Sequence, residues 1–280
     1  MRLPPNTPYN GSTIDCDSAK YNYRYMSIDP VSFLPPRLVQ PHLPLLVCFP
    51  GMDGTGRLFD KQIVGTIDRF DLRCLSIATN DLSSWQVLMD RAVQLILTEL
   101  APGQQLYLCG ESFGACFAMQ VAQQLGAKID RLVLINPASS FARLPLLAAG
   151  SALSGLLPDA FYPLSAQILV NFLINEDRVT PTARQNLLDA ILSVHPQTAA
   201  WRLNLLRQFP VHSIVPKLVD LPILLIAGQL DRLLPSSLEV RILALMLPKS
   251  KTLLLPRSGH ACLLERDIHL TDLVSQLPTK

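Results

Sequence analysis

The chain has 280 residues, of which 49% are hydrophobic and 16% are charged, and its formal net charge is +2. This composition is typical of one globular domain with a large core, and so weak a charge gives no reason to expect nucleic acid as a partner. The six cysteines are scattered without the paired spacing of a zinc site. We therefore expect buried, reduced thiols, no metal or other cofactor, and a cytoplasmic protein.

Residues 1–20 are rich in proline and asparagine where a secretory signal would need an apolar segment. They predict a flexible lead-in to a single domain over residues 21–280. The most apolar stretch, Leu144–Leu157, is shorter than the ~20 residues of a membrane span and is bracketed by prolines.

The first core strand is expected at Leu45–Phe49, an uninterrupted apolar run, and the glycine-rich segment Pro50–Gly56 follows it as a tight loop. No Lys-Ser or Lys-Thr comes after these glycines, which argues against a phosphate-binding loop. The loop instead suits an oxyanion hole, with the backbone amide of Met52 as one donor. The Met52 side chain is equally suited to lining an apolar acyl pocket, and both interpretations stay open.

The sequence Gly110-Glu111-Ser112-Phe113-Gly114 stands between an apolar run and a segment with helical character, 115–126. A G-x-S-x-G in that setting predicts a nucleophile elbow, a strained turn that exposes the serine Oγ above the sheet. Glycine flanks the turn because side chains there would collide with the neighbouring strand and helix. Ser112 is the expected nucleophile, and the amide of Phe113 is the expected second donor of the oxyanion hole.

The next two apolar runs, 131–136 and 222–228, are separated by many more residues than one crossover helix needs. The intervening region, about 141–215, is expected to form several helices, punctuated by prolines, that cap the catalytic edge. Most of its apolar side chains are expected to be the cap's own core. We also consider an apolar acyl or prenyl tunnel whose outer lip, at Leu146, Leu147 and Leu153, makes peripheral contact with a membrane.

Asp231 follows the second of these runs, and His260 lies in a loop after a short strand predicted at Thr252–Leu255. The chain order serine, acid, histidine is the one in which a parallel-sheet hydrolase delivers its triad. Ligands of open α/β sheets bind beyond the carboxyl ends of the strands, where the three side chains can converge. Helices are expected from Ser236 to Leu247 and from near Cys262 onward.

Other residues compete for these roles. An Asp after a strand is usually a turn residue or a helix cap. Some such hydrolases take the acid from the preceding strand, but its tail here, Asn136–Ser139, has no carboxylate, and Asp267 and Asp272 are interpreted as solvated surface. Asp231 is thus assigned by elimination. The other four histidines lie before the core, in the inserted region or on the final helix: His42, His195, His212 and His269.

With these motifs the chain resembles the α/β-hydrolases over about 21–277, and within them the hydrolase-like half of the plastid phytyl ester synthases. The likeness is carried by residues 49–56, 110–115, 134–141 and 258–260. It implies a mostly parallel central sheet with helices on both faces and a helical cap inserted after the sixth strand. Those plant proteins make phytyl esters and triacylglycerol from fatty acyl donors. They also carry an acyltransferase-like region, which needs a His followed five positions later by Asp; in this sequence His260 has Glu265 there.

Three classes of function follow. The favoured one is a serine hydrolase of lipophilic carboxylic esters or thioesters, in which Asp231 orients His260, His260 takes the proton of Ser112, and an acyl-enzyme forms. The alternative is an acyltransferase that uses the same residues to move fatty acyl groups to a lipid alcohol such as phytol or diacylglycerol. A non-enzymatic binding role is third. The expected partner is the small lipophilic substrate, and no obligate protein partner is inferred.

Overall fold

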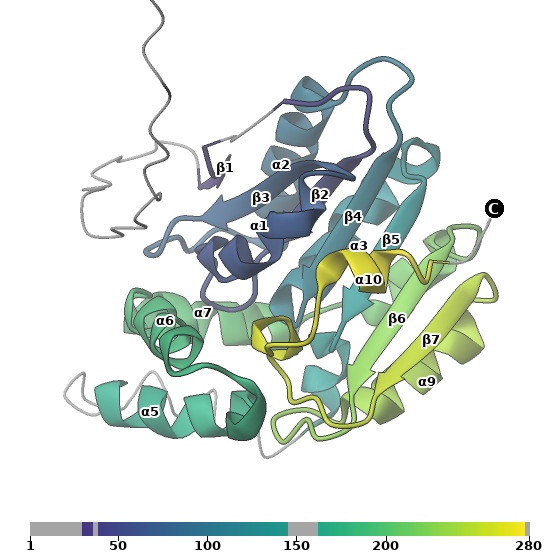
Figure 1. Cartoon of the computed structure of the whole chain (residues 1–280). Helices are drawn as coiled ribbons and strands as arrows, with labels where there is room; N and C mark the ends of the chain where they lie inside the picture. The colour runs from purple at the N-terminus through teal and green to yellow at the C-terminus, as the bar shows by residue number, and fades with distance from the viewer. Residues whose placement is uncertain (1–29, 36–38, 145–161, 278–280) are drawn as a thin grey trace, which may run out of the picture.

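The computed structural model describes residues 30–35, 39–144 and 162–277 (Figure 1). The expected N-terminal lead-in, 1–20, and the expected membrane lip at Leu146, Leu147 and Leu153 lie outside these ranges.

In the described part of the chain, seven strands form one sheet in the order β1-β3-β2-β4-β5-β6-β7. β1 pairs antiparallel with β3, and every other neighbouring pair is parallel. The strands are β1 (Val31–Phe33), β2 (Leu45–Phe49), β3 (Asp71–Ile77), β4 (Leu106–Glu111), β5 (Arg131–Ile135), β6 (Ile223–Gly228) and β7 (Ser250–Leu255). The predicted α/β architecture with a mostly parallel sheet is confirmed.

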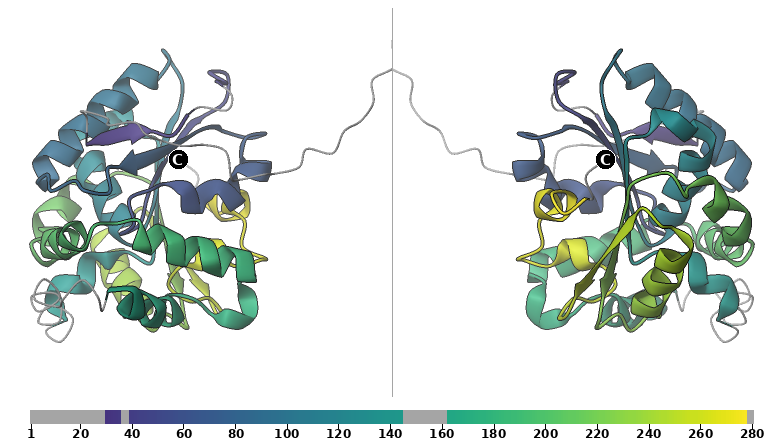
Figure 2. Two further views of the ribbon diagram at one scale, coloured as in Figure 1. Left: turned by 90° about the vertical axis from the view of Figure 1, so that its left-hand side faces the viewer. Right: turned by 90° about the vertical axis from the view of Figure 1, so that its right-hand side faces the viewer.

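Helices cover both faces of this sheet, as the two side views show (Figure 2). Successive side chains of a strand point to opposite faces, so a strand covered on both sides is apolar throughout. In β2, Leu45 and Val47 join the cluster that includes α2, α3 and α9, while Leu46 and Cys48 join the cluster that includes α10. These helices are α1 (Asp60–Thr66), α2 (Trp85–Glu99), α3 (Phe113–Leu125), α9 (Ser236–Met246) and α10 (Leu270–Val274). None of the helices in the described ranges is long and apolar enough to cross a membrane.

The segment between β5 and β6 is called the insertion below, and most of its described part lies where the parallel strands end (Figure 1). Its described helices are α5 (Tyr162–Leu173), α6 (Pro181–Leu192), α7 (Pro196–Arg207) and α8 (Val211–Ile214). They form two packing units. α5 and α6 share a cluster with Ala261 and Leu264 of the loop after β7, whereas α7 and α8 add Leu205 and Ile214 to the main core. The insertion was expected after the sixth strand, but in the described residues it follows the fifth, β5. The count differs because a single strand, β1, precedes β2 in the described part of the chain.

The helix expected from near Cys262 is wrong in its position. Cys262–Leu264 forms a single 3-10 turn, and α10 begins at Leu270. The difference comes from Glu265, whose buried carboxylate accepts hydrogen bonds of 2.8 Å from Ser258 Oγ and from Gly259 N. The backbone of Glu265 is extended and bridges Val179 of the insertion. A helix through this residue would break both sets of contacts.

Five cysteines fall within the described ranges, and all five are buried and free: Cys48, Cys74, Cys109, Cys116 and Cys262.

Candidate active site

Ser112 stands at the sharp turn between β4 and α3, and its backbone is strained. Its φ of 58° and ψ of −117° lie in a region that side chains other than glycine rarely adopt. The turn is closed by Ser112 N, which donates to Ile135 O of β5 at 2.9 Å, and by Ala115 N, which donates to Ser112 O at 3.1 Å. The strain is thus held by neighbouring backbone on both sides of the serine.

The glycines of the motif allow close backbone packing. A Cβ atom on Gly110 would lie 2.2 Å from the carbonyl oxygen of Gly114, and a Cβ on Gly114 would lie 2.2 Å from the carbonyl oxygen of Phe49. Both contacts are with backbone atoms, which have no room to move aside. Glycine is therefore required at both positions for the elbow to form against β2.

His260 connects the serine to the acid. Its Nε2 lies 2.7 Å from Ser112 Oγ, and its Nδ1 lies 2.7 Å from Asp231 Oδ2. Ser112, Asp231 and His260 come from the loops after β4, β6 and β7. The carboxyl ends of these strands lie along one edge of the parallel sheet, with β5 between β4 and β6. The His260 and Asp231 side chains are 3% and 1% exposed, so both are shielded from water. The structure therefore brings together the three side chains that the sequence singled out, and their catalytic roles stay a prediction.

Asp231 is held as a carboxylate. Its Oδ1 accepts hydrogen bonds from Leu233 N at 2.9 Å and Leu234 N at 3.0 Å, and its Oδ2 accepts a further bond from Ser236 Oγ. Burial raises the pKa of Asp231. The charge of His260 and these hydrogen bonds lower this pKa by a larger amount, so the net pKa lies below its ordinary value. An acid that stays ionised while it is bound to Nδ1 can hold one tautomer of the histidine.

Burial lowers the pKa of His260, and the charge of Asp231, with a smaller contribution from Glu111, raises it by more. The net pKa lies above the ordinary 6.5. A base of this kind accepts a proton more readily than a solvent-exposed histidine does.

Asn136, at the end of β5, joins the loops that carry the acid and the histidine, a role that sequence reasoning missed. Its Nδ2 donates to His260 O at 2.6 Å, and its Oδ1 accepts from Gly228 N at 2.8 Å. The side chain is fully buried, and its φ of 44° is left-handed. The Asn-Pro-Ala-Ser tail has no carboxylate, and nothing in its sequence indicates that the amide at its first position joins two distant loops.

A second missed residue is Glu265, which lies behind His260. Besides Ser258 and Gly259, its carboxylate binds Arg178 Nε of the insertion at 2.6 Å. A buried carboxylate is costly unless it is fully paired. Here the pairing ties the histidine loop to the segment between α5 and α6.

Of the remaining histidines, His195 accepts a hydrogen bond from Gln197 N at the start of α7.

The loop after β2 lies directly against the elbow, because a Cβ on Gly114 would also come within 2.5 Å of the carbonyl oxygen of Pro50. Met52 sits within a turn that Gly54 N closes by donating to Gly51 O at 3.0 Å. Phe113 is the first residue of α3, so its amide has no acceptor inside the helix. Both predicted oxyanion donors thus belong to segments that meet at Ser112, and their role stays a prediction.

Glu111 places a second carboxylate beside the histidine. Burial raises the pKa of Glu111 from 4.5 to about 7, although the charge of His260 and a 3.4 Å hydrogen bond from Leu263 N oppose the shift. In return, an ionised Glu111 raises the pKa of His260. In the sequence, Glu111 stands only at a variable position of the G-x-S-x-G motif, which does not indicate this contact.

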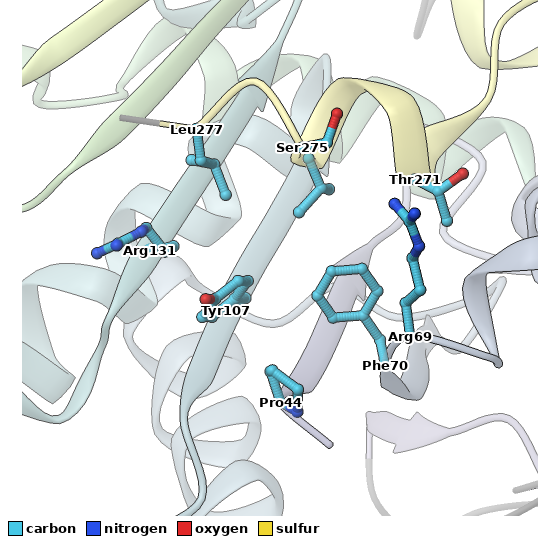
Figure 3. Close-up of a pocket in the computed structure, with 9 residues that line it drawn as sticks. Pro44, Arg69, Phe70, Tyr107, Arg131, Thr271, Ser275 and Leu277 are labelled. Carbon is cyan, nitrogen blue, oxygen red and sulfur yellow. The ribbon is translucent and has the colours of Figure 1, made fainter. Parts of the chain in front are cut away.

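A hollow of about 310 Å³ lies at the opposite edge of the sheet (Figure 3). Pro44, Phe70, Tyr107 and Arg131, which line it, stand at the beginnings of strands. Ser112, Asp231 and His260 follow strand ends, so this hollow is separate from the candidate active site.

Replacing Glu111 with Gln is expected to change how stability depends on pH. The pKa of Glu111 is raised in the folded protein, so its favourable contribution is complete below pH 4.5 and is lost as the pH rises to about 7. Relative to wild type, Glu111→Gln should gain up to about 3 kcal/mol of unfolding free energy across this range. Urea unfolding at several pH values measures the difference. Glu176→Gln, at an exposed site, is the control, and parallel curves for wild type and Glu111→Gln would contradict the expectation.

Comparisons with proteins of known sequence relate this chain to phytyl ester synthases. It is 28% identical to phytyl ester synthase 1, chloroplastic, of Arabidopsis thaliana over 262 residues, which are 82% of this chain and 36% of that protein. It is 34% identical to phytyl ester synthase 2, chloroplastic, of the same plant over 131 residues, or 45% of this chain and 18% of that protein. The match thus spans well under half the length of either relative.

Solved structures agree on the fold. A hydrolase from Oleispira antarctica superposes with a TM-score of 0.71 at 14% identity, over 88% of this chain and 93% of that chain. A thermophilic esterase from Thermogutta terrifontis gives 0.68 at 18% identity, over 88% and 92%. Sequence identities this low establish the architecture alone.

The alpha/beta hydrolase fold family matches residues 44–267. The match runs from the residue before β2 past His260, and it includes the elbow, the loops that carry Asp231 and His260, and the insertion. Together with the parallel sheet, the strained serine and the agreement in architecture, this match shows that the chain belongs to the α/β-hydrolase fold family.

Proposed function

We propose that this protein is a serine hydrolase that cleaves carboxylic esters or thioesters of lipophilic acyl groups. The observation that carries the proposal is the continuous chain of two 2.7 Å contacts from Asp231 through His260 to Ser112 Oγ. A serine that meets a buried, acid-oriented histidine is an activated nucleophile. A binding protein has no need of this arrangement, and we therefore favour an enzyme.

In the proposed reaction, His260 Nε2 takes the proton of Ser112 as Oγ attacks the substrate carbonyl. Asp231 stays ionised and stabilises the imidazolium that forms. His260 then returns the proton to the leaving alcohol or thiol, which departs and leaves an acyl group on Ser112. Water, deprotonated by His260, attacks the acyl-enzyme, the acid is released, and Ser112 regains its proton.

The amides of Met52 and Phe113 serve as the oxyanion donors in this proposal. The contact between the β2 loop and the elbow supports it, as does the position of Phe113 at the start of α3. The tetrahedral intermediate carries its negative charge on the former carbonyl oxygen, and two fixed N–H groups stabilise that charge better than mobile water does.

The preference for lipophilic substrates is proposed from two observations. The relatives named above are phytyl ester synthases. The described helices α5, α6 and α7 of the insertion lie on the strand-end side of the sheet (Figure 1). We propose that the insertion, about residues 141–215, caps the site with its apolar side. The enzyme as proposed needs no cofactor or metal, since serine chemistry supplies every step.

Ester hydrolysis and active-site labelling test the proposal directly. Wild type should hydrolyse p-nitrophenyl esters, with rates that rise with acyl chain length, and should be labelled by a fluorophosphonate probe. Ser112→Ala should lose about 10⁶-fold in kcat, and its labelling should vanish. Ser275→Ala, at the opposite end of the sheet, is the control.

Because the pKa of His260 is raised, activity should fall with decreasing pH around a midpoint above 6.5. Folded wild type that neither hydrolyses esters nor reacts with the probe would refute the proposal.

Acyl transfer to a lipid alcohol is the second candidate, and the similarity to phytyl ester synthases favours it. Transfer and hydrolysis share the acyl-enzyme and differ only in what attacks it. Acylated protein is offered water together with phytol or diacylglycerol, and the products are separated. A transferase should give mainly the lipid ester. Free acid as the main product, unchanged by added alcohol, would leave hydrolysis as the function.

We also propose a cytoplasmic protein that makes peripheral contact with membranes through the insertion. On α5, Leu164, Ile168 and Phe172 recur every fourth residue and are 58%, 52% and 48% exposed. The helix has no charged residue, so neutral lipid is the expected surface. Replacing all three with Ser should reduce co-sedimentation with phosphatidylcholine vesicles several-fold, whereas Leu245→Ser on α9 should have no effect. Equal binding by wild type and the triple variant would rule out this surface.

A further inference from the structure

A buried arginine of the insertion reaches the loop after β2. Arg202 of α7 is 1% exposed, and its guanidinium lies over the ends of two parallel strands. Nη1 donates to the carbonyl oxygen of Met52 at 2.8 Å, and Nη2 donates to that of Ala78, the first residue after β3, at 2.9 Å. One side chain therefore fixes two strand-end loops to the insertion.

The backbone of the loop leaves room for this guanidinium. Gly54 has a φ of +70°, and a Cβ atom there would lie 2.5 Å from Arg202 Nη1. Gly54 also ties the loop to β3, since its carbonyl oxygen accepts from Ile77 N at 2.7 Å. Glycine at 54 and arginine at 202 thus fit one another, although they are far apart in the sequence.

Attachment of α7 to the rest of the protein does not by itself require the charge. Trp201 Nε1 donates to Ser83 O at 2.9 Å, and Trp85 Nε1 donates to Leu205 O at 2.9 Å. Leu205 and Leu206 also pack into the main core. Burying a cation is costly. Because these contacts already anchor α7, an apolar side chain at position 202 would be enough to keep the helix in place. The arginine therefore calls for another explanation.

The environment of Arg202 retains its charge. Burial lowers the pKa of Arg202 on balance, although the carboxylates of Asp53 and Asp81 oppose that shift. A guanidinium nevertheless stays protonated inside proteins. Asp53 is itself buried, and its Oδ2 accepts from Thr55 N at 2.8 Å and from Thr55 Oγ1. A cation placed here strengthens both carbonyl hydrogen bonds, because charge-assisted bonds are roughly twice as strong as neutral ones.

We propose that Arg202 is a positioning residue for the oxyanion hole: by binding the Met52 carbonyl it fixes the conformation of residue 52, so that the Met52 amide stays directed at the oxyanion. This inference rests on the proposed serine chemistry. The Met52 N–H belongs to the peptide between Gly51 and Met52, which the turn holds through one hydrogen bond, from Gly54 N to Gly51 O at 3.0 Å. The glycines at the two ends of this turn let its peptides rotate at little cost, and Arg202 holds the following peptide by the Met52 carbonyl. Rotation would turn the donor away from the site and leave Ser112, His260 and Asp231 untouched.

The test separates the turnover step from binding and from protonation. Arg202→Ala should lower kcat for a p-nitrophenyl ester about 10- to 100-fold, part of the loss expected for a whole oxyanion donor. KM should not change, because the substrate contacts remain. The pH at which activity falls to half on acidification should also not change, because His260 remains. A trifluoromethyl ketone, whose serine adduct carries the oxyanion, should bind more weakly by the same factor as the loss in kcat. Arg202→Lys keeps the charge and one donor, and should recover part of the activity, as should free guanidinium added to Arg202→Ala.

Two matched variants on α7 serve as controls. Arg207→Ala removes an exposed guanidinium that donates to Asn204 Oδ1 of the same helix at 2.8 Å. Trp201→Phe weakens the anchoring of α7 by removing the donor to Ser83 O, and it leaves the Arg202 guanidinium and its Met52 partner in place. Both should keep wild-type kcat, although Trp201→Phe should unfold at lower temperature.

The outcomes are distinct. An active wild type whose Arg202→Ala variant keeps kcat once folded, or changes only KM or the pH at which activity falls to half, would overturn the role of Arg202 alone. A wild type without hydrolysis or fluorophosphonate labelling would overturn the proposed function, and this inference with it.

Discussion

The two-sided binding of His260 is the contact on which the rest of the site depends. Its ring nitrogens bind Ser112 and Asp231, its carbonyl oxygen accepts from Asn136, and its loop is fixed by Glu265. Each partner follows a different strand or comes from beyond the last one. Correct placement of a single imidazole therefore requires the parallel order of β4, β5, β6 and β7, and this links the sheet to the candidate site.

The insertion acts on this arrangement from two directions. α5 and α6 have their own apolar cluster and contact the histidine loop, with Arg178 pairing with Glu265 behind it. α7 belongs to the main core and brings Arg202 to the β2 loop. The two units therefore serve different loops of the same site. A substitution in the insertion far from Ser112 would disturb either the His260 loop or the loop after β2, according to the unit in which it falls.

Local sequence patterns predicted much of this fold and the residues at its centre. The predicted bounds of β2 match the observed ones. The G-x-S-x-G motif indicates Ser112, the end of an apolar run together with the lack of another carboxylate indicates Asp231, and a loop after a short strand indicates His260. Asn136, Glu265 and Arg202 were missed because their partners are 92 to 150 residues away or lie in the insertion, and no pattern of neighbours records such a pairing. The misplaced helix near Cys262 has the same origin, since the burial of Glu265 depends on Arg178.

The identity of the residue after Asn136 has a consequence for the chemical durability of the protein. Asparagine side chains in proteins age chiefly by cyclising onto the backbone nitrogen of the following residue, which converts the amide to an acid. Pro137 has no N–H with which to form that ring. An amide that must both donate to His260 and accept from Gly228 is thereby protected from spontaneous deamidation, and a carboxylate could not replace it as a donor.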